Sequence, residues 1–189
     1  ISGKIKEIKS RHQFVIGYTG SHGIANALEN LINAVKIINN DEFAFVLFGK
    51  GPEKDKLKNL ASTCSNIYFF DPVAKVQVPH LLSHFDAFFI GWNRQPLYRF
   101  GVSPNKLFDY MMAGKPVIQA IDAGNDPVAE SGCGISIEPE SPQPLADAIV
   151  QLKNMSAAER VRLGEAGRNY VLENHNYKVL AEKCLNILS

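Results

Sequence analysis

From Phe14 onward, the sequence alternates short apolar runs with longer segments of helical periodicity. The segment 26–39 shows the helical pattern, since Leu28, Leu31, Ile32 and Val35 recur at i, i+3, i+4 and i+7. This alternation is typical of βα units, whose parallel strands are joined by right-handed crossovers. The sequence therefore predicts an α/β fold, a doubly wound, Rossmann-like parallel sheet of about six strands with helices on both faces. The predicted strands are FVIGYT (14–19), FAFVLFG (43–49), NIYFFD (66–71), DAFFIG (86–91), PVIQAI (116–121) and the weaker GISIE (134–138).

The two ends of the chain differ from this pattern. Residues 1–13 are rich in charge and have few apolar residues to bury, so we expect a linker from an N-terminal domain outside this sequence. Residues 14–189 are expected to form one domain, which is helical from about Ser141 onward. Within that helical region, Gly164 and Gly167 indicate either turns or close helix contacts.

Composition excludes several classes of function. Lys and Arg number 20 against 19 Asp and Glu, and a net charge of +1 cannot supply the broad positive field of a nucleic-acid-binding protein. No apolar run approaches the ~20 residues that span a bilayer, so no transmembrane segment is expected. The three cysteines form no CxxC pair, and His80 and His84 lack a nearby third ligand, so neither disulfides nor a metal site is predicted. A reducing, cytoplasmic location fits this cysteine usage.

Ligands of doubly wound sheets bind at the carboxyl ends of the strands. Gly17, Gly20 and Gly23 lack the GxGxxG spacing of a dinucleotide site, and neither GK pair, at 49–50 or 114–115, is followed by Ser or Thr as in a Walker loop. NAD binding and P-loop ATP hydrolysis are therefore disfavoured. The loops that remain candidates begin at Thr19, Gly49, Asp71, Gly91 and Ala120.

The most informative segment is FGVSPNKLFDYMMAGKPVI, residues 100–118. Ser103 followed by Pro104 predicts a helix start, with Ser103 as the capping residue. The backbone amides of Asn105 and Lys106, together with the Lys106 ammonium, would then bind phosphate. Asp109 lies close enough on the same helix to accept hydrogen bonds from a ribose. The alternative is an ordinary capped helix, which does not account for Lys106 and Asp109 together.

For the other candidate site residues we consider a functional and a structural interpretation. Gly20, Ser21 and Gly23 predict either a tight turn or a close approach of backbone to a diphosphate. His22 is expected to be a solvated loop residue rather than a phosphate donor. Between residues 92 and 116 four basic residues face one acid, yet Arg94 and Arg99 could equally be solvated. Asp71 and Pro72 either end a strand or help to hold a base.

Four segments of the sequence resemble those of a known protein family. SPNKLFDYMMAGKPVI, with LFGKGPEKDKLK, FFDPVAKVQVPHLLSHFDAFFI and AESGCGISIEPE, resembles the C-terminal, donor-binding domain of GT-B glycosyltransferases of family 4, in its bacterial surface-polysaccharide branch. The resemblance covers nearly the whole chain. It implies a nucleotide sugar as donor, with a nucleotide-linked amino or deoxy sugar typical of the branch, retention of the anomeric configuration, and no metal.

The resemblance also implies roles for individual residues. Asp109 matches the second of the family's two glutamates, which holds the ribose, whereas the first glutamate, which touches the sugar, falls on Gly101. The family's Arg and Lys after the first strand fall near Ser21 and Ala25, so Lys106, together with Arg99, is expected to supply the positive charge. Val73 matches a residue that packs against the base.

We therefore expect one half of a glycosyltransferase that binds a UDP-sugar as substrate, needs no cofactor, and is inactive alone. The acceptor would be a glycan or a lipid-linked sugar held by the missing N-terminal domain, with the full protein at the inner face of the membrane. Two alternatives remain open, a nucleotide-sugar epimerase of the same fold and a non-catalytic nucleotide-sugar-binding module.

Overall fold

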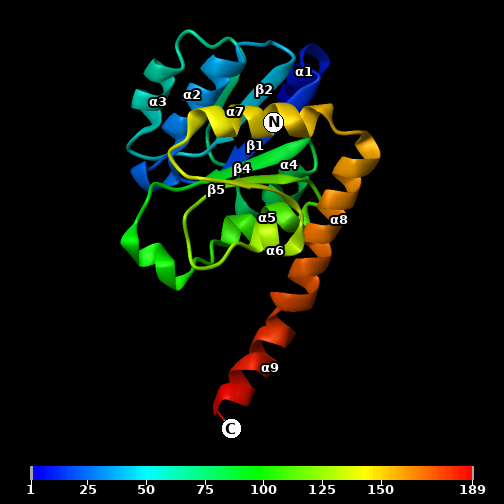
Figure 1. Ribbon diagram of the computed structural model, residues 1–189. Coiled ribbons are helices and arrows are strands. Elements are labelled where there is room, and N and C mark those ends of the chain that lie inside the picture. Colours follow the sequence, from blue (N-terminus) through cyan, green and yellow to red (C-terminus); the bar gives the residue numbers. More distant parts are fainter. Residues whose placement is uncertain (1, 189) are drawn as a thin grey trace.

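The protein forms a single parallel sheet with helices on both faces, as a computed structural model that describes residues 2–188 shows (Figure 1). Within those residues six strands lie in the order β3-β2-β1-β4-β5-β6, and every neighbouring pair is parallel. The predicted doubly wound fold is therefore confirmed. The strands are β1 (Phe14–Thr19), β2 (Phe43–Phe48), β3 (Ile67–Phe70), β4 (Ala87–Gly91), β5 (Val117–Ala120) and β6 (Gly134–Ile137).

Alternate strand residues fill two separate cores, because successive side chains of a strand point to opposite faces. Phe14, Ile16 and Tyr18 pack into the core on the first face, whereas Val15 packs into the core on the second. The helices of the first face are α2 (Leu28–Ile38), α3 (Lys54–Leu60) and α7 (Pro142–Asn154). Those of the second are α1 (Ser2–Arg11), α4 (Val78–Leu82), α5 (Asn105–Met112), α6 (Pro127–Ser131) and α8 (Ala157–Asn174).

The strand order reverses between β1 and β4, and this reversal is the feature that positions a site. The chain leaves β1 toward α2 on one face and leaves β4 toward α5 on the other, so the two connections diverge. Ligands of doubly wound sheets bind in the crevice that such a divergence creates. Short 3-10 helices follow three of the strands: η1 (Ile24–Asn26) follows β1, η2 (Lys75–Gln77) follows β3 and η3 (Pro96–Phe100) follows β4.

The N-terminal segment differs from its prediction. Residues 2–11 form α1, in which Ile5 and Ile8 are 0% and 5% exposed and pack into the second core. Lys9 of the same helix pairs with Asp86 at 2.9 Å. The expectation that residues 1–13 have little to bury is wrong, because the i, i+3 spacing of the two isoleucines gives this charged helix one apolar face. That the segment connects to a further domain stays a prediction.

The C-terminal region is helical, as predicted. The long helix α8 begins with a capping box between Ser156 and Glu159, runs along the second face, and is followed by α9 (Tyr177–Leu188), which extends away from the body (Figure 1). Gly164 and Gly167 lie inside α8 rather than in turns, and both are buried in close helix contacts. None of the helices within residues 2–188 is both long and apolar enough to cross a membrane.

Candidate functional site

A pocket of about 480 Å³ opens at the carboxyl edge of the sheet. It lies among the connections that follow β1, β2 and β3, and α5 supplies one of its walls. The predicted site residues Gly20, Ser21, Val73, Lys106 and Asp109 all line it. Its remaining lining residues are Thr19, Phe48, Gly49, Lys50, Pro72, Lys75 and Val78.

Tyr110 fixes α5 against the end of β1. Its hydroxyl accepts a hydrogen bond from the Thr19 amide at 2.7 Å and donates one to the Thr19 carbonyl at 3.1 Å, while its ring stacks on Phe88 with 4.4 Å between centroids. Tyr110 is fully buried. Because Lys106 lies four residues before it and Asp109 directly precedes it, this anchor sets the positions of both candidate binding residues.

Lys106 presents a largely desolvated ammonium to the pocket. Its Nζ donates to the Tyr18 hydroxyl at 3.2 Å and to the Asn26 side-chain oxygen. Burial disfavours the charged form and lowers the pKa of Lys106 to about 8. Both of these hydrogen-bond partners are neutral, and a desolvated cation that is not neutralised attracts an anion strongly, since water screens it poorly.

Asp109 lines the same pocket three residues further along α5. Partial burial raises the pKa of its carboxyl, and the charge of Lys75 acts in the opposite direction. Three lysines, Lys50, Lys75 and Lys106, line the pocket with this one carboxylate, so its net charge is +2 when all four groups are ionised. The pocket therefore suits a ligand that carries negative charge and hydroxyl groups together.

The floor of the pocket is built from two loops that pair through their backbones. The Gly20 amide donates to the Phe48 carbonyl and the His22 amide to the Lys50 carbonyl, both at 2.9 Å, and the Glu53 amide returns a hydrogen bond to His22 at 3.0 Å. A Cβ added to Gly49 would lie 1.8 Å from the Gly20 carbonyl oxygen. Only glycine fits there, so the open readings for Gly20 and Ser21 resolve into a tightly paired loop that borders the pocket.

His22 corrects an expectation. Instead of being solvated, its side chain is completely buried between the rings of Tyr18 and Phe69, with centroids 6.1 and 6.0 Å away. Neither ring nitrogen has a hydrogen-bond partner among residues 2–188. Desolvation, with the nearby Lys54 and Lys58, lowers the pKa of His22 to about 4. The imidazole is therefore neutral near pH 7 and packs as an aromatic ring, because the paired loops close over it.

Lys54 organises the side of the pocket that carries Val73. Its ammonium donates to the carbonyls of Gly49 at 2.9 Å and Phe70 at 3.1 Å, and to the Asp71 carboxylate at 2.7 Å. The ends of β2 and β3 are thereby tied together. Asp71 thus pairs with a lysine where its strand ends, while Pro72 and Val73 beyond it face the pocket.

The start of α5 differs from its prediction. The helix begins at Asn105 with Pro104 as N-cap, and no side chain in the described structure makes the capping hydrogen bond. The predicted capping role of Ser103 is therefore wrong, and its side chain is exposed. Pro104 has extended backbone angles, φ −81° and ψ 121°, which place it just outside the helix rather than in its first position. Ser103, Pro104 and Asn105 are not among the residues that line the pocket.

Arg99 and Gly101 lie apart from Lys106. Arg99 lies over the ring of Phe100, 4.6 Å from its centroid, and lines a different pocket together with Arg94. Arg94 pairs with Asp122 at 2.6 Å and with Glu138 at 2.5 Å, so its charge is already compensated. Gly101 has a φ of 96°, which favours glycine, and packs against Asn125. The structure thus leaves Lys106 without help from Arg99 in this conformation.

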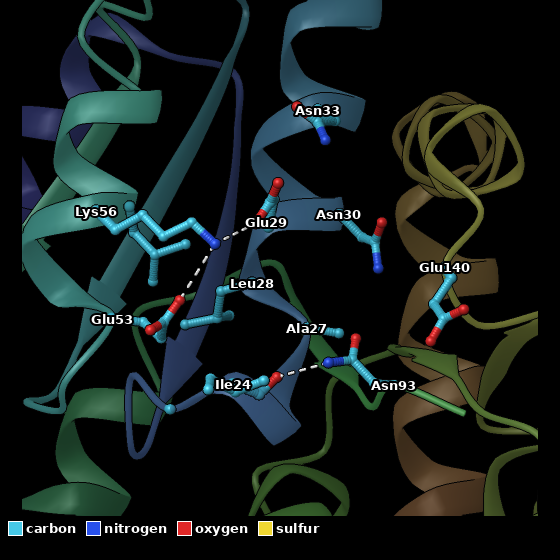
Figure 2. A pocket seen from close by; sticks show the side chains of 12 residues that line it. Ile24, Ala27, Leu28, Glu29, Asn30, Asn33, Glu53, Lys56, Asn93 and Glu140 are labelled. Carbon is cyan, nitrogen blue, oxygen red and sulfur yellow. Dashed lines mark hydrogen bonds and ion pairs between the residues drawn. The ribbon is translucent and has the colours of Figure 1, made fainter. Parts of the chain in front are cut away.

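Gly23 instead lines a second pocket of about 220 Å³, whose other lining residues come mainly from the region of α2 and α3 and include Asn93 and Glu140 (Figure 2). There Lys56 lies between Glu29 and Glu53, with distances of 2.9 and 3.4 Å. Lys56 is thereby compensated by two carboxylates, and it is the one basic residue among the described residues that line this pocket, so the pocket offers no uncompensated cation to a phosphate. Gly23 is therefore not brought together with Lys106.

Several lining residues were missed by sequence reasoning, among them Lys50, Lys75 and Val78. The signal that could have found them is their place in or at the end of the connections that follow β2 and β3, which were predicted to border the ligand, but they belong to no recognised motif. Within residues 2–188 no group of three His, Cys, Asp or Glu side chains is arranged to hold a metal ion.

Known proteins resemble this chain over most of its length. The model of the family described as "Glycosyl transferases group 1" matches residues 13–155. The probable glycosyltransferase WbjE of Pseudomonas aeruginosa is 24% identical over 174 residues, which are 89% of this chain but 42% of that protein. The chain thus spans less than half the length of this curated relative.

Solved structures share the fold. HepE of Anabaena, in complex with UDP-glucose, superposes with a TM-score of 0.78 at 17% identity, over 99% of this chain and 51% of that one. TarM of S. aureus, in complex with UDP and other ligands, superposes with a TM-score of 0.75 at 19% identity, over 92% of this chain and 35% of that one. The C-terminal domain of the group 1 glycosyl transferase LpcC from Francisella tularensis gives 0.73 at 16% identity, over 93% and 92%.

Proposed function

Because the chain belongs to the group 1 family of glycosyl transferases, we propose that it binds the nucleotide diphosphate sugar in a retaining, metal-independent glycosyltransferase. The resemblance to the C-terminal domain of a GT-B glycosyltransferase is confirmed by the family and the fold. Membership of family 4 stays a prediction.

The observation that carries the proposal is that Lys106 and Asp109 line one pocket at the carboxyl edge of the sheet, with a net charge of +2. In the proposed complex the Lys106 ammonium binds the diphosphate by charge-assisted hydrogen bonds. Asp109 accepts from the ribose hydroxyls, and the base packs against Pro72 and Val73. The volume of about 480 Å³ lies within the range of small-molecule sites.

The same arrangement gives Lys106 a role in the chemistry. When the glycosidic bond to the donor phosphate breaks, the leaving nucleoside diphosphate gains negative charge. A cation that is already in place stabilises this charge more than it stabilises the intact donor, which lowers the barrier. Lys106 would thus do in part what a divalent metal does in other transferases.

We propose uridine as the base, an amino or deoxy sugar as the transferred group, and a glycan or lipid-linked acceptor in polysaccharide biosynthesis. The UDP in the structures of HepE and TarM supports the choice of nucleotide. The acceptor would bind to an N-terminal domain, and the relatives that are much longer than this chain support a further domain.

Calorimetric titration of the chain with UDP in buffer containing EDTA tests the proposal. We expect binding that EDTA leaves unchanged, with an affinity in the high-micromolar range at best, since a single half of a cleft leaves the ligand open to water. Loss of binding on chelation would contradict the metal-free site, and absence of UDP binding under all conditions would contradict the donor-domain assignment. Release of UDP by the full-length protein only when an acceptor is present would separate a transferase from an epimerase.

A further inference from the structure

The Lys106 ammonium is held from two sides by the segment opposite α5. An ammonium has three N–H donors. One points to the hydroxyl of Tyr18 in β1, 3.2 Å away, and another to the side-chain oxygen of Asn26 in η1. The third N–H donor has no hydrogen-bond partner among residues 2–188. Because Lys106 lines the pocket, this donor is available to a ligand there.

Tyr18 is oriented so that it can only accept from Lys106. Its own hydroxyl proton is donated to the Ser21 carbonyl at 2.7 Å, and its side chain is fully buried. Burial raises the pKa of Tyr18 far above its ordinary value, so the phenol stays protonated. The Lys106 Nζ also lies 4.9 Å from the centroid of the Tyr18 ring, a favourable distance for a cation near an aromatic ring.

Asn26 is fixed by the turn in which it lies. Its backbone amide donates to the Gly23 carbonyl at 3.0 Å. The following residue, Ala27, has left-handed backbone angles that end the turn. The Asn26 oxygen is therefore presented from a defined position. An amide oxygen attracts the ammonium without neutralising it, whereas a carboxylate there would form an ion pair and compete with an incoming phosphate.

We propose that Tyr18 and Asn26 are positioning residues that fix the Lys106 ammonium at the pocket before the diphosphate arrives. This inference rests on the proposed function of the pocket. A free lysine side chain loses much rotamer freedom when it is immobilised by a ligand, and an ammonium that is already held avoids most of that loss. Gly20 leaves the space for this arrangement, since a Cβ there would lie 3.0 Å from the Tyr18 hydroxyl and 3.4 Å from Lys106 Nζ.

Titration of the chain with UDP, for the wild type and for Tyr18→Phe and Asn26→Ala, tests the inference. Each substitution should lower the affinity for UDP by ~3- to 10-fold, the loss expected for one hydrogen bond. In a Lys106→Ala background the same substitutions should have no further effect, since their action passes through Lys106. Tyr170→Phe and Asn33→Ala, which alter matched residues outside the pocket, should bind as the wild type does.

A second measurement needs no ligand. In chain labelled with ¹³C at the lysine ε-carbons, the titration midpoint of Lys106 is read by NMR and assigned by its absence in Lys106→Ala. Asn26→Asp should move this midpoint upward by about one pH unit or more, because a carboxylate would then contact the ammonium. The other ionisable groups of the pocket, Lys50, Lys75 and Asp109, are unchanged by this substitution.

The outcomes are distinguishable. If the wild type does not bind UDP but Asn26→Asp moves the Lys106 midpoint, the proposed function fails and the positioning contact stands. If Lys106→Ala weakens UDP but Tyr18→Phe and Asn26→Ala do not, the positioning role is overturned and the function stands. Equal losses for the two substitutions with and without Lys106 would also overturn it, as would an unchanged midpoint in Asn26→Asp.

Discussion

Gly164 in α8 packs directly on Gly114, at the turn that ends the segment carrying Lys106 and Asp109. A Cβ built on Gly164 would lie 2.0 Å from the Gly114 carbonyl oxygen and 2.9 Å from the Lys115 amide nitrogen. The added Cβ would therefore meet rigid backbone atoms and not the flexible end of a side chain. The close approach of these two glycines lets α8 support α5 from the side opposite the pocket.

Gly164→Ala should therefore destabilise the fold. The methyl group cannot be accommodated without a backbone shift, and overpacking of this kind costs about 1 to 3 kcal/mol in free energy of unfolding. Urea denaturation followed by circular dichroism measures it. Gly3→Ala is the matched control, since a Cβ there meets nothing within 4 Å. If both variants unfold at the wild-type midpoint, the contact between α8 and the Gly114 turn is not as close as described.

Lys106→Ala should weaken UDP binding by about 1.5 to 3 kcal/mol, the loss expected for a hydrogen bond to a charged group. Calorimetry in EDTA gives the affinity. Lys6→Ala, which removes a lysine of α1 that does not line the pocket, should leave it unchanged. A similar loss in both variants would mean that general charge, rather than Lys106, attracts the nucleotide.

Asp109→Asn should weaken UDP by roughly 1 kcal/mol or more while it barely affects pyrophosphate, because the carboxylate is proposed to accept from ribose hydroxyls. Competition titrations with the two ligands measure the difference. Equal losses for UDP and pyrophosphate would instead make Asp109 a structural residue of α5.

The buried His22 should make the fold sensitive to acid. Its pKa is lowered from 6.5 to about 4, so between these values the unfolded chain binds a proton that the folded chain does not. The contribution of His22 to stability is therefore complete above about pH 6.5 and is lost as the pH falls toward 4. Urea denaturation at pH 7 and pH 4.5 should show that the free energy of unfolding is lower at pH 4.5, with a contribution from His22 on the order of 2 to 3 kcal/mol. The loss should be absent in His22→Gln, and identical pH dependences for the two proteins would contradict the buried, neutral imidazole.

The chain alone should transfer no sugar. We propose that its pocket binds the donor alone, and holding both reactants together is worth as much as about 7 to 11 kcal/mol, which a surface for one reactant does not provide. Incubation with UDP-sugars and with simple or lipid-linked sugar acceptors should release no UDP above the rate in buffer, whereas the full-length protein should turn over. Acceptor-dependent turnover by these 189 residues would contradict the division of labour between two domains.

The sheet could be predicted because its signal is local. Each apolar run such as FAFVLFG is long enough to be buried on both faces, and the helical segments between the runs show one apolar stripe. The prediction for α1 failed for a reason of the same kind. Ile5 and Ile8 form a stripe of only two residues, and which surface they meet depends on α4 and β1, far away in the sequence.

The site could be predicted only in part. Lys106 and Asp109 follow from one continuous segment, so their place on one helix was accessible from sequence. The burial of His22 was not, because it depends on pairing between two loops about 30 residues apart. Lys54 was missed for the same reason, since its three acceptors come from the end of β3 and from the connections that follow β2 and β3. Ser103 was assigned as a cap from its neighbour Pro104, yet the helix begins one residue later than that pattern suggests.

The paired loops under the pocket have a consequence for engineering. Since Gly20 and His22 bond to Phe48 and Lys50, and Glu53 bonds back, the ladder of β1 and β2 continues past the last residue of either strand. Residues 20–22 and 48–53 are therefore coupled through three backbone hydrogen bonds. An exchange of either loop alone for that of a relative has to preserve three backbone hydrogen bonds, so we expect a graft meant to change the lining of the pocket to need both loops.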